Sequence, residues 1–472
     1  IIGAGPAGLA AADSLRRMGF QVTVYDRYDR GGGLLTYGIP GFKLEKDVVM
    51  RRVEQLEQGG VEFVLNCEVG TDISFGEIRN KHNAVLIATG VYKSRDLGGP
   101  GSGAAGIVRA IDYLTASNRK SFGDEVPEFD TGELDAKGKR VVVIGGGDVA
   151  MDAARTALRH QDYQEARLGS EDDTADERSL MTEALDAART ATRAGATQVT
   201  VISLESEEEM PASPFELEEA QHEAITFVHR RGPARVLSEN GKVVGLETIG
   251  VLSVFDENGR FSPTFDADDL RSVEADTVIL AVGQAVDVDA LGETGPEISP
   301  RRTIAVDNDT LQTSLEMVWA GGDAARGPRT LIEAIADGRI AAREIHEAFG
   351  GTFLQQDSGT MVQLDQFHRL DDVYDRVPRV DVPTLPTDRR IGLAEVETGF
   401  TIEQARCEAQ RCLRCFANIL LDTDKCVLCA LCADVCPLDL ISLVPSEEIH
   451  PDDPGGTALM LNEQSCIRCA LC

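Results

Sequence analysis

Two glycine-rich segments, each placed between a strand-like and a helix-like stretch, constrain the fold of this chain most strongly. They read Gly3-Ala-Gly5-Pro-Ala-Gly8 and Gly145-Gly-Gly147-Asp148-Val-Ala150. In a βαβ unit the first glycine allows a tight turn, the second lets the backbone approach a pyrophosphate, and the third small residue lets the helix pack closely. The two segments therefore predict an α/β protein with two Rossmann-like dinucleotide-binding units.

The residues after each segment extend this interpretation. Asp26 ends the strand 22–25, where an acid accepts a hydrogen bond from a ribose hydroxyl. Behind the second segment the next strand, 198–202, comes far later than usual, so residues 161–195 are interpreted as an inserted helical excursion. Strands that end at Gly90 and Gly283 follow the first and second segment respectively.

The cysteine spacing near the C-terminus predicts iron–sulfur clusters. The ligand candidates are Cys426, Cys429, Cys432 and Cys436, followed by proline, and then Cys466, Cys469 and Cys472. This C-x2-C-x2-C-x3-C-P run is typical of ferredoxins with two [4Fe–4S] clusters, in which the fourth cysteine binds the other cluster. Structural zinc is the alternative, and the repeated triplet argues against it.

In the crossed arrangement Cys436 shares a cluster with the last three cysteines. The first three would then need a thiolate about four residues past Cys472. Because Ile1 also begins inside a strand, we expect this sequence to be a piece of a longer protein. For Cys407, Cys412 and Cys415, on an expected helix 401–415, a structural role is favoured over a further cluster.

Charge and hydropathy exclude several functions. The net charge of −33 argues against a nucleic-acid ligand or an anionic membrane surface, which need clustered Lys and Arg. No apolar run approaches the roughly 20 residues that cross a bilayer, so direct membrane insertion is not expected. Cysteines at cluster spacing must stay reduced, which predicts a cytoplasmic protein.

Further motifs carry a resemblance to a known family. They are 32–40 (GGLLTYGIP), 42–44 (FKL), 145–152 (GGGDVAMD), 208–212 (EEMPA) and 320–323 (AGGD). Through them residues 1 to about 350 resemble the small-subunit family of glutamate synthase. The resemblance implies FAD on the first segment and a nicotinamide nucleotide on the second. Since the first βαβ unit is complete, it predicts FAD rather than FMN.

The resemblance also implies domain limits. These are 1–100 and 285–350 for a discontinuous FAD-binding domain, 101–284 for the NAD(P)-binding domain, 351–415 for a linker and helix, and 416–472 for a small α+β ferredoxin-like domain. With both nucleotide domains of the pyridine nucleotide-disulfide oxidoreductase type, the expected fold class is α/β with this α+β domain appended. The tail is similar to that of the flavoprotein associated with dissimilatory sulfite reductase. The linker is too short for the barrel that dihydropyrimidine dehydrogenase carries there.

Site residues follow by position. FAD would be held by Gly3, Gly5, Gly8, Asp26, Gly33, Leu35, Thr89, Gly90, Gly322 and Asp323, and the nicotinamide nucleotide by Gly145, Gly147, Asp148, Ala150, Glu205 and Gly283. The helix from residue 330 to 338 would direct its N-terminus at the flavin. No catalytic acid, base or nucleophile is expected, because the cofactors carry the chemistry.

The predicted function is electron transfer between NAD(H) and a protein partner through FAD and two [4Fe–4S] clusters. A ferredoxin or a larger redox-enzyme subunit would be the partner, in a hetero-complex, and the direction stays open. One alternative is the electron-input subunit of a glutamate synthase. Another is an iron–sulfur scaffold subunit that binds nucleotide without turning it over.

A departure from the family predicts the preferred nucleotide. Leu204-Glu205 stands where the family has an Arg-Arg pair that would bind the 2′-phosphate of NADP. A carboxylate repels that phosphate and accepts from the free 2′-hydroxyl of NAD, so NAD(H) is predicted. The alternative is that Glu205 is one more solvated acid, and even then no cation is expected nearby.

Overall fold

The computed structural model describes residues 1–159, 195–351, 379–390, 394–410, 429–436, 440–445 and 456–461, apart from 95, 99, 258 and 293. The chain divides into two compact units. The first comprises Ile1–Gln355 and Leu385–Val396, and the second comprises Gln356–Thr384 and Glu397–Cys472. Residues 161–194 of the predicted insertion lie outside the described residues.

A short parallel sheet organises the first half of the first unit. Its strands are β1 (Thr23–Tyr25), β2 (Glu62–Val64), β3 (Val85–Ile87) and β14 (Val318–Ala320). β1 pairs with β2, and β3 pairs with β14. Ile2 joins the two pairs, because it bridges to Tyr25 on one side and to Ile87 on the other. The first glycine-rich segment therefore leaves the middle of this sheet.

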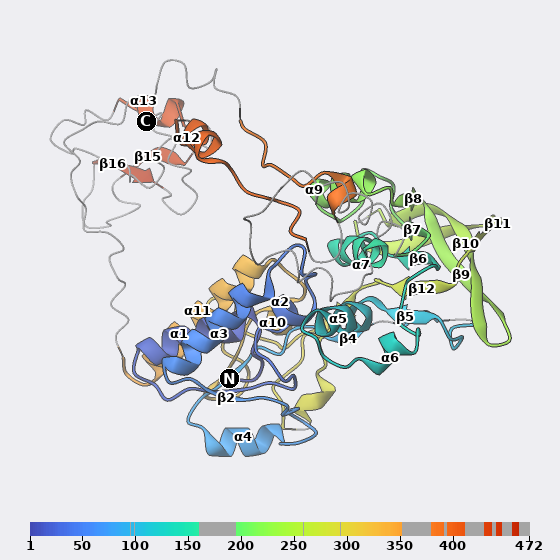
Figure 1. The fold of residues 1–472 in the computed structure, drawn as a ribbon. Coiled ribbons are helices and arrows are strands. Elements are labelled where there is room, and N and C mark those ends of the chain that lie inside the picture. Colours follow the sequence, from blue (N-terminus) through green and yellow to red (C-terminus); the bar gives the residue numbers. More distant parts are fainter. Residues whose placement is uncertain are drawn as a thin grey trace, which may run out of the picture. The chain divides into compact units, whose positions relative to one another are not determined.

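Helices cover both faces of this sheet. α1 (Pro6–Arg17), α3 (Lys46–Gln58) and α11 (Leu331–Ala348) lie side by side (Figure 1). α1 and α11 pack closely, since a Cβ atom at Gly338 would lie 2.2 Å from the Ala7 carbonyl oxygen. α4 (Phe75–Lys81) buries its apolar side chains in a separate core with the alternate residues of the strands, so it covers the opposite face.

A five-stranded parallel sheet organises the second half of this unit. In spatial order its strands are β5 (Ile107–Arg109), β12 (Thr277–Leu280), β6 (Arg140–Ile144), β7 (Gln198–Ile202) and β8 (Thr226–Val228). One face packs on α5 (Ala110–Ser121), α7 (Asp148–Leu158) and α9 (Pro214–His222). The other face packs on an antiparallel sheet of β9 (Arg231–Glu239), β10 (Lys242–Phe255) and β11 (Phe261–Glu274). The predicted fold class, with two Rossmann-like halves, is confirmed.

Short elements complete the first unit. β4 (Lys93–Ser94) pairs with β13 (Gln284–Ala285) where the chain passes between the halves. The remaining elements are α2 (Leu34–Tyr37), α6 (Pro127–Asp130), α10 (Asp323–Arg326) and two 3-10 turns at Asp289–Leu291 and Thr387–Arg389.

The second unit contains a small α+β region. α12 (Ile402–Gln410) covers most of the expected helix 401–415, whose last residues lie outside the described part. α13 (Leu431–Asp434) precedes an antiparallel pair formed by β15 (Ile441–Pro445) and β16 (Thr457–Leu461). Among the described residues of the whole chain, no helix has the length and apolar character that a membrane span requires.

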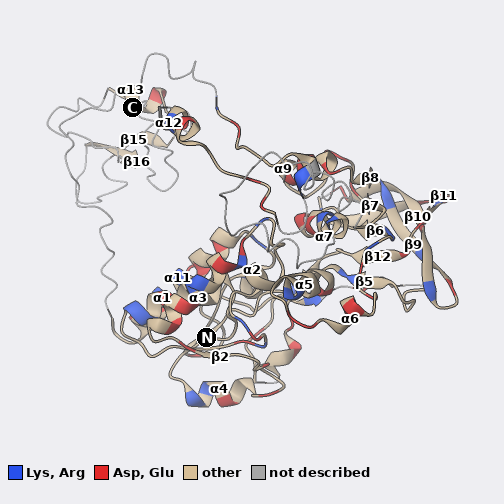
Figure 2. Ribbon diagram, in the orientation of Figure 1, with Lys and Arg blue, Asp and Glu red and all other residues tan. Residues whose placement is uncertain are grey.

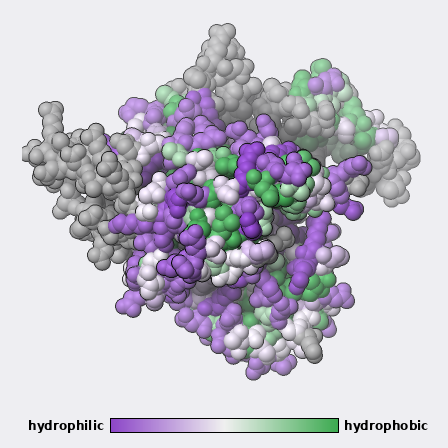
Figure 3. Space-filling view, turned by 90° about the vertical axis from the view of Figure 1, so that its right-hand side faces the viewer, coloured by the Kyte–Doolittle hydropathy of each residue, from purple (hydrophilic) through white to green (hydrophobic). Residues whose placement is uncertain are grey.

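The surface of the described helices carries charges of both signs. α4, for example, has Glu77, Arg79 and Lys81 within seven residues (Figure 2). Apolar surface is also visible among the hydrophilic side chains on the side of β9, β10 and β11 (Figure 3). Exposed large apolar side chains on these strands are Leu252, Phe255, Phe261, Phe265 and Leu270.

Candidate functional site: two glycine turns at helix N-termini

The first glycine turn is held by backbone contacts that leave no room for a side chain. Gly3 has φ +105°, and a Cβ atom there would lie 2.3 Å from the Ala88 carbonyl oxygen. A Cβ atom at Gly8 would lie 2.0 Å from the Gly3 carbonyl oxygen, so the helix packs directly on the turn. Each glycine thus has the steric role that the sequence predicts for it.

Gly5 differs from its two neighbours, because a Cβ atom there would meet nothing within 4 Å. It is the N-cap of α1, and its helix has no side-chain cap. The first N–H groups of a helix need partners, and together with the helix dipole they bind anions. The open space at Gly5 therefore fits a phosphate group of a dinucleotide.

Asp26 is buried at the end of β1 and contacts this turn. One carboxylate oxygen accepts from the Ala4 N–H at 2.6 Å, and the other accepts from the Tyr28 N–H at 2.9 Å. Burial raises the pKa of Asp26, while the two N–H donors and Arg27 lower it. Each oxygen retains a further acceptor site, so a ribose hydroxyl is still able to bind there.

The predicted flavin-site residues gather around the same turn. A Cβ atom at Gly33 would lie 2.9 Å from Gly5 Cα and 3.4 Å from the Tyr92 hydroxyl. One at Gly322 would lie 3.0 Å from Ala7 Cβ. Gly90 borders Tyr92 and lines one pocket with Gly3, Asp26 and Thr89. Thus segments from four parts of the chain meet at the start of α1.

Three further residues at this pocket were not predicted. The Arg27 guanidinium lies 4.2 Å from the ring centroid of Tyr92 and 5.1 Å from that of Tyr28. All three side chains line the pocket with Asp26. Their positions offered a signal, because they follow Asp26 and Gly90 by one or two residues. Cys67 also lines it and follows the end of β2 in the chain.

Leu35 and Asp323 occupy polar surroundings in this half. The Leu35 carbonyl accepts from Lys46 Nζ at 2.8 Å, and burial lowers the pKa of Lys46 to about 8. Burial raises the pKa of Asp323 to about 6.

The N-terminus of α11 differs from that of α1, because Thr330 and Glu333 form a capping box there. Two of its N–H donors are therefore already satisfied within the protein.

The second glycine turn repeats the geometry of the first. Gly145 has φ +143°, and a Cβ atom there would lie 2.4 Å from the Ala281 carbonyl oxygen. Gly147 is open and caps α7 without a side-chain hydrogen bond, while Ala150 is fully buried. Asp148 accepts from the Ser213 N–H at 2.9 Å, which ties α9 to the turn. Gly283 ends the strand region beside it and is open.

Glu205 lies against this second turn. A Cβ atom at Gly146 would lie 2.8 Å from a Glu205 carboxylate oxygen, which places the acid beside the middle glycine. The expectation that no cation lies nearby is wrong. The Arg230 N–H donates to the Glu205 carbonyl, and the Arg230 guanidinium pairs with Glu209 at 2.8 Å. The chain turns back after β8, so a residue distant in sequence reaches this corner.

The cluster motif is described only in part. Cys429, Cys432 and Cys436 form no disulfide, and the Leu440 N–H donates to Cys436 Sγ at 3.4 Å. Hydrogen bonds of this kind to cysteine sulfur tune the potential of iron–sulfur clusters. Cys426, Cys466, Cys469 and Cys472 lie outside the described residues. Within the described ones, no group of three His, Cys, Asp or Glu side chains is placed to hold a metal ion.

Comparisons with known proteins agree with this geometry. The family model described as pyridine nucleotide-disulphide oxidoreductase matches residues 1–338, and a 4Fe-4S binding domain matches residues 419–442. A putative glutamate synthase [NADPH] small chain of Cereibacter sphaeroides is 49% identical over 354 residues. That match covers 73% of this chain and 75% of the relative.

Two other relatives are longer than the matched region. A glutamate synthase [NADPH] small chain of Azospirillum brasilense is 43% identical, over 73% of this chain and 65% of its own length. The β subunit of an NADP(+)-dependent formate dehydrogenase of Moorella thermoacetica is 32% identical, over 88% of this chain and 54% of its own. Among solved structures, Mycobacterium tuberculosis FprA in complex with NADPH has a TM-score of 0.56 at 20% identity, over 74% of this chain and 84% of that one.

The fold and the two turns thus define an oxidoreductase with two dinucleotide-binding halves and an appended iron–sulfur domain. The chain belongs to the pyridine nucleotide-disulphide oxidoreductase family. Within it, the chain is a glutamate synthase small-subunit-like FAD-dependent protein that carries a 4Fe-4S binding domain.

A pair of substitutions separates the two roles of the glycines in the first turn. Gly8→Ala should lower the free energy of unfolding by at least about 2 kcal/mol, because its methyl group meets a backbone oxygen. Gly5→Ala should fold normally, since its methyl group has room, but should bind FAD more weakly. Thermal unfolding of the flavin-free protein measures the change in stability, and titration with FAD measures the change in affinity. A Gly5→Ala protein that retains full FAD affinity would contradict the placement of the pyrophosphate.

Proposed function

We propose that this protein carries electrons between a nicotinamide nucleotide and a protein partner, through FAD and two [4Fe–4S] clusters. The observation that carries the proposal is the pair of matching glycine turns, each opening onto an uncapped helix N-terminus, in a chain with a cluster motif. FAD supplies hydride acceptance and single-electron release when it is bound. The protein binds and orients the groups, with the first turn, Asp26, Gly33 and Gly322 around FAD.

A hetero-complex is the proposed setting for this activity. The relatives from Azospirillum and Moorella are named as a small chain and a β subunit, which supports a larger redox partner. The named relatives favour the electron-input subunit of a glutamate synthase as the second candidate function. A dissimilatory sulfite reductase is a third candidate partner, suggested by the cluster motif that follows the nucleotide domains. Copurification with a glutaminase-bearing large subunit would select the second candidate.

One experiment tests the core of the proposal. The purified protein should release FAD on denaturation, contain iron and sulfide, and reduce a dye with a nicotinamide nucleotide as donor. Release of FMN would overturn the cofactor assignment. Bound FAD and clusters without nucleotide-dependent dye reduction would favour the scaffold alternative.

We infer that the second site prefers NAD(H). A Glu205 oxygen beside Gly146 would repel a 2′-phosphate and accept from a free 2′-hydroxyl. The named NADPH relatives and the nearby Arg230 favour the other nucleotide. However, Glu209 already pairs with the Arg230 guanidinium, so the region beside Gly146 holds two carboxylates and one arginine.

A charge reversal tests this preference. Glu205→Arg should raise the ratio of kcat/KM for NADPH to that for NADH by at least about tenfold, the value of one charge-assisted hydrogen bond. Adding Leu204→Arg should shift it further. Glu207→Arg is the matched control, because Glu207 is an exposed acid two residues away. An equal or higher kcat/KM with NADPH than with NADH in the unmodified protein would contradict the inferred preference for NAD(H).

Cys436 tests the crossed ligation of the clusters. If Cys436 binds the cluster of the last three cysteines, the electron paramagnetic resonance spectrum of reduced Cys436→Ser should match that of Cys469→Ser. A spectrum that matches Cys429→Ser instead would show uncrossed ligation. Cys407→Ser is the control, since this exposed thiol on α12 lies outside the motif.

A further inference from the structure

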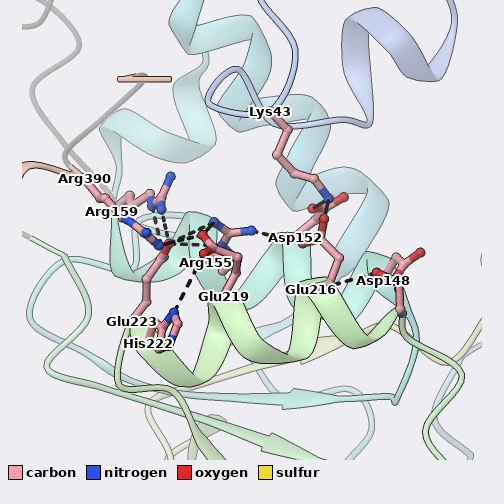
Figure 4. Close-up of polar contacts among 11 residues, drawn as sticks. Lys43, Asp148, Asp152, Arg155, Arg159, Glu216, Glu219, His222, Glu223 and Arg390 are labelled. Carbon is pink, nitrogen blue, oxygen red and sulfur yellow. Dashed lines mark hydrogen bonds and ion pairs between the residues drawn. The ribbon is translucent and has the colours of Figure 1, made fainter. Parts of the chain in front are cut away.

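A buried network of ion pairs joins four separate segments of the first unit (Figure 4). Among the described residues, its cations are Lys43, Arg155, Arg159 and Arg390, and its carboxylates are Asp152, Glu216, Glu219 and Glu223. α7, α9 and the residue that directly follows each helix supply all but Lys43 and Arg390. Seven of the eight side chains are at most 11% exposed, and Lys43 is 25% exposed.

Lys43 comes from the first half of the unit and enters the second. It follows α2 in the chain, and its Nζ lies 2.8 Å from Asp152 Oδ1 and 2.6 Å from Glu216 Oε1. The neighbouring Phe42 is buried, and the Arg159 guanidinium carbon lies 3.9 Å from its ring centroid. Two adjacent residues of the first half therefore make ionic and cation–π contacts with the helices of the second half.

These contacts reach the second glycine turn through short, rigid elements. Asp152 lies four residues after Asp148, or about 6 Å along α7, which begins at that turn. Glu216 lies in the first turn of α9, whose N-cap Ser213 donates to Asp148 through its N–H. Both carboxylates that hold Lys43 are thus fixed to the turn that binds the second nucleotide.

Arg390 closes the network from the segment that leads to the cluster domain. Its Nη1 lies 2.6 Å from Glu219 Oε2 and 3.4 Å from Glu223 Oε1, and its Nε donates to the Leu385 carbonyl at 2.8 Å. Within the described part of the chain, these contacts pair Arg390 with two buried carboxylates of the second half. The segment 385–390 is therefore anchored by ion pairs and not only by packing.

We propose that this network is the joint that sets the second nucleotide-binding half against the first. Lys43 is its positioning residue, and Arg390 anchors the connection to the iron–sulfur domain at the same point. The inference rests on the proposed function, since the relative placement of the halves fixes the distance between nicotinamide and flavin. Neither residue takes part in the chemistry.

The first test compares Lys43→Met with Lys43→Arg in the full-length, cofactor-loaded protein. Lys43→Met should slow flavin reduction by NADH about 10- to 100-fold, the expected effect of misplaced reactants, with a nucleotide Kd within about twofold because the second turn is intact. Lys43→Arg should recover most of the rate. Lys93→Met is the control, since Lys93 forms an exposed pair with Asp289 at 2.6 Å.

A second readout does not depend on activity. Hydrogen exchange should increase in residues 40–46 and in α7 of Lys43→Met, and should not do so in Lys93→Met. If Lys43→Met does not accumulate as folded protein, Asp152→Asn tests the same contact. Unchanged exchange together with an unchanged rate would overturn the proposal. If NADH fails to reduce the flavin of the unmodified protein, the proposed function fails and the exchange data alone decide on the joint.

Arg390→Met separates the two parts of the joint. It should leave flavin reduction by NADH unchanged within about twofold, because Lys43 keeps both of its partners. It should raise hydrogen exchange in residues 385–390 and slow the subsequent reduction of the clusters. Equal slowing of both steps would contradict a separate anchor for the cluster domain.

Discussion

The structure depends on backbone contacts that only glycine permits. In each half, the first glycine of the turn has positive φ, and the space of its missing side chain is filled by a carbonyl oxygen. The partners are Ala88 for Gly3 and Ala281 for Gly145. Each partner stands two residues before a second glycine, Gly90 or Gly283, so strand end and helix start are locked together. The helix N-terminus can then face a ligand with its N–H groups unobstructed.

Local sequence patterns predicted the two glycine turns and the elements around them well. The two turns, their strands and helices, and the position of Asp26 all follow from spacing within about thirty residues. The hydrogen bond from Ala4 to Asp26 did not follow, because it links the acid to the turn instead of to a ligand. The long antiparallel strands β9, β10 and β11 were also missed. Their alternation is interrupted by register shifts in both pairings, which weakens the periodic signal.

Long-range contacts explain what the sequence did not reveal about the second site. Glu205 was identified by its place in the chain, but Arg230 comes from the connection between β8 and β9 and pairs with Glu209. The charge around Glu205 depends on which residues the fold brings together and not on one sequence motif. A carboxylate beside Gly146 and a neutralised arginine together weaken the case for phosphate recognition that the arginine alone would make.

The buried network shows why charges are retained where apolar side chains would pack. Burial raises the pKa of Asp152 to about 6, above its ordinary value, despite the opposing effect of Lys43. When the pKa of a carboxyl group is higher in the folded than in the unfolded protein, the folded protein loses stability as pH rises from the unfolded to the folded pKa. The charged form of Asp152 therefore costs stability at neutral pH. Replacing the ion pairs with apolar side chains would remove that cost, but it would also remove the directional contacts between the two halves. Lys43 pairs with two fixed carboxylates, so it specifies one placement of the two halves, whereas apolar side chains would tolerate several.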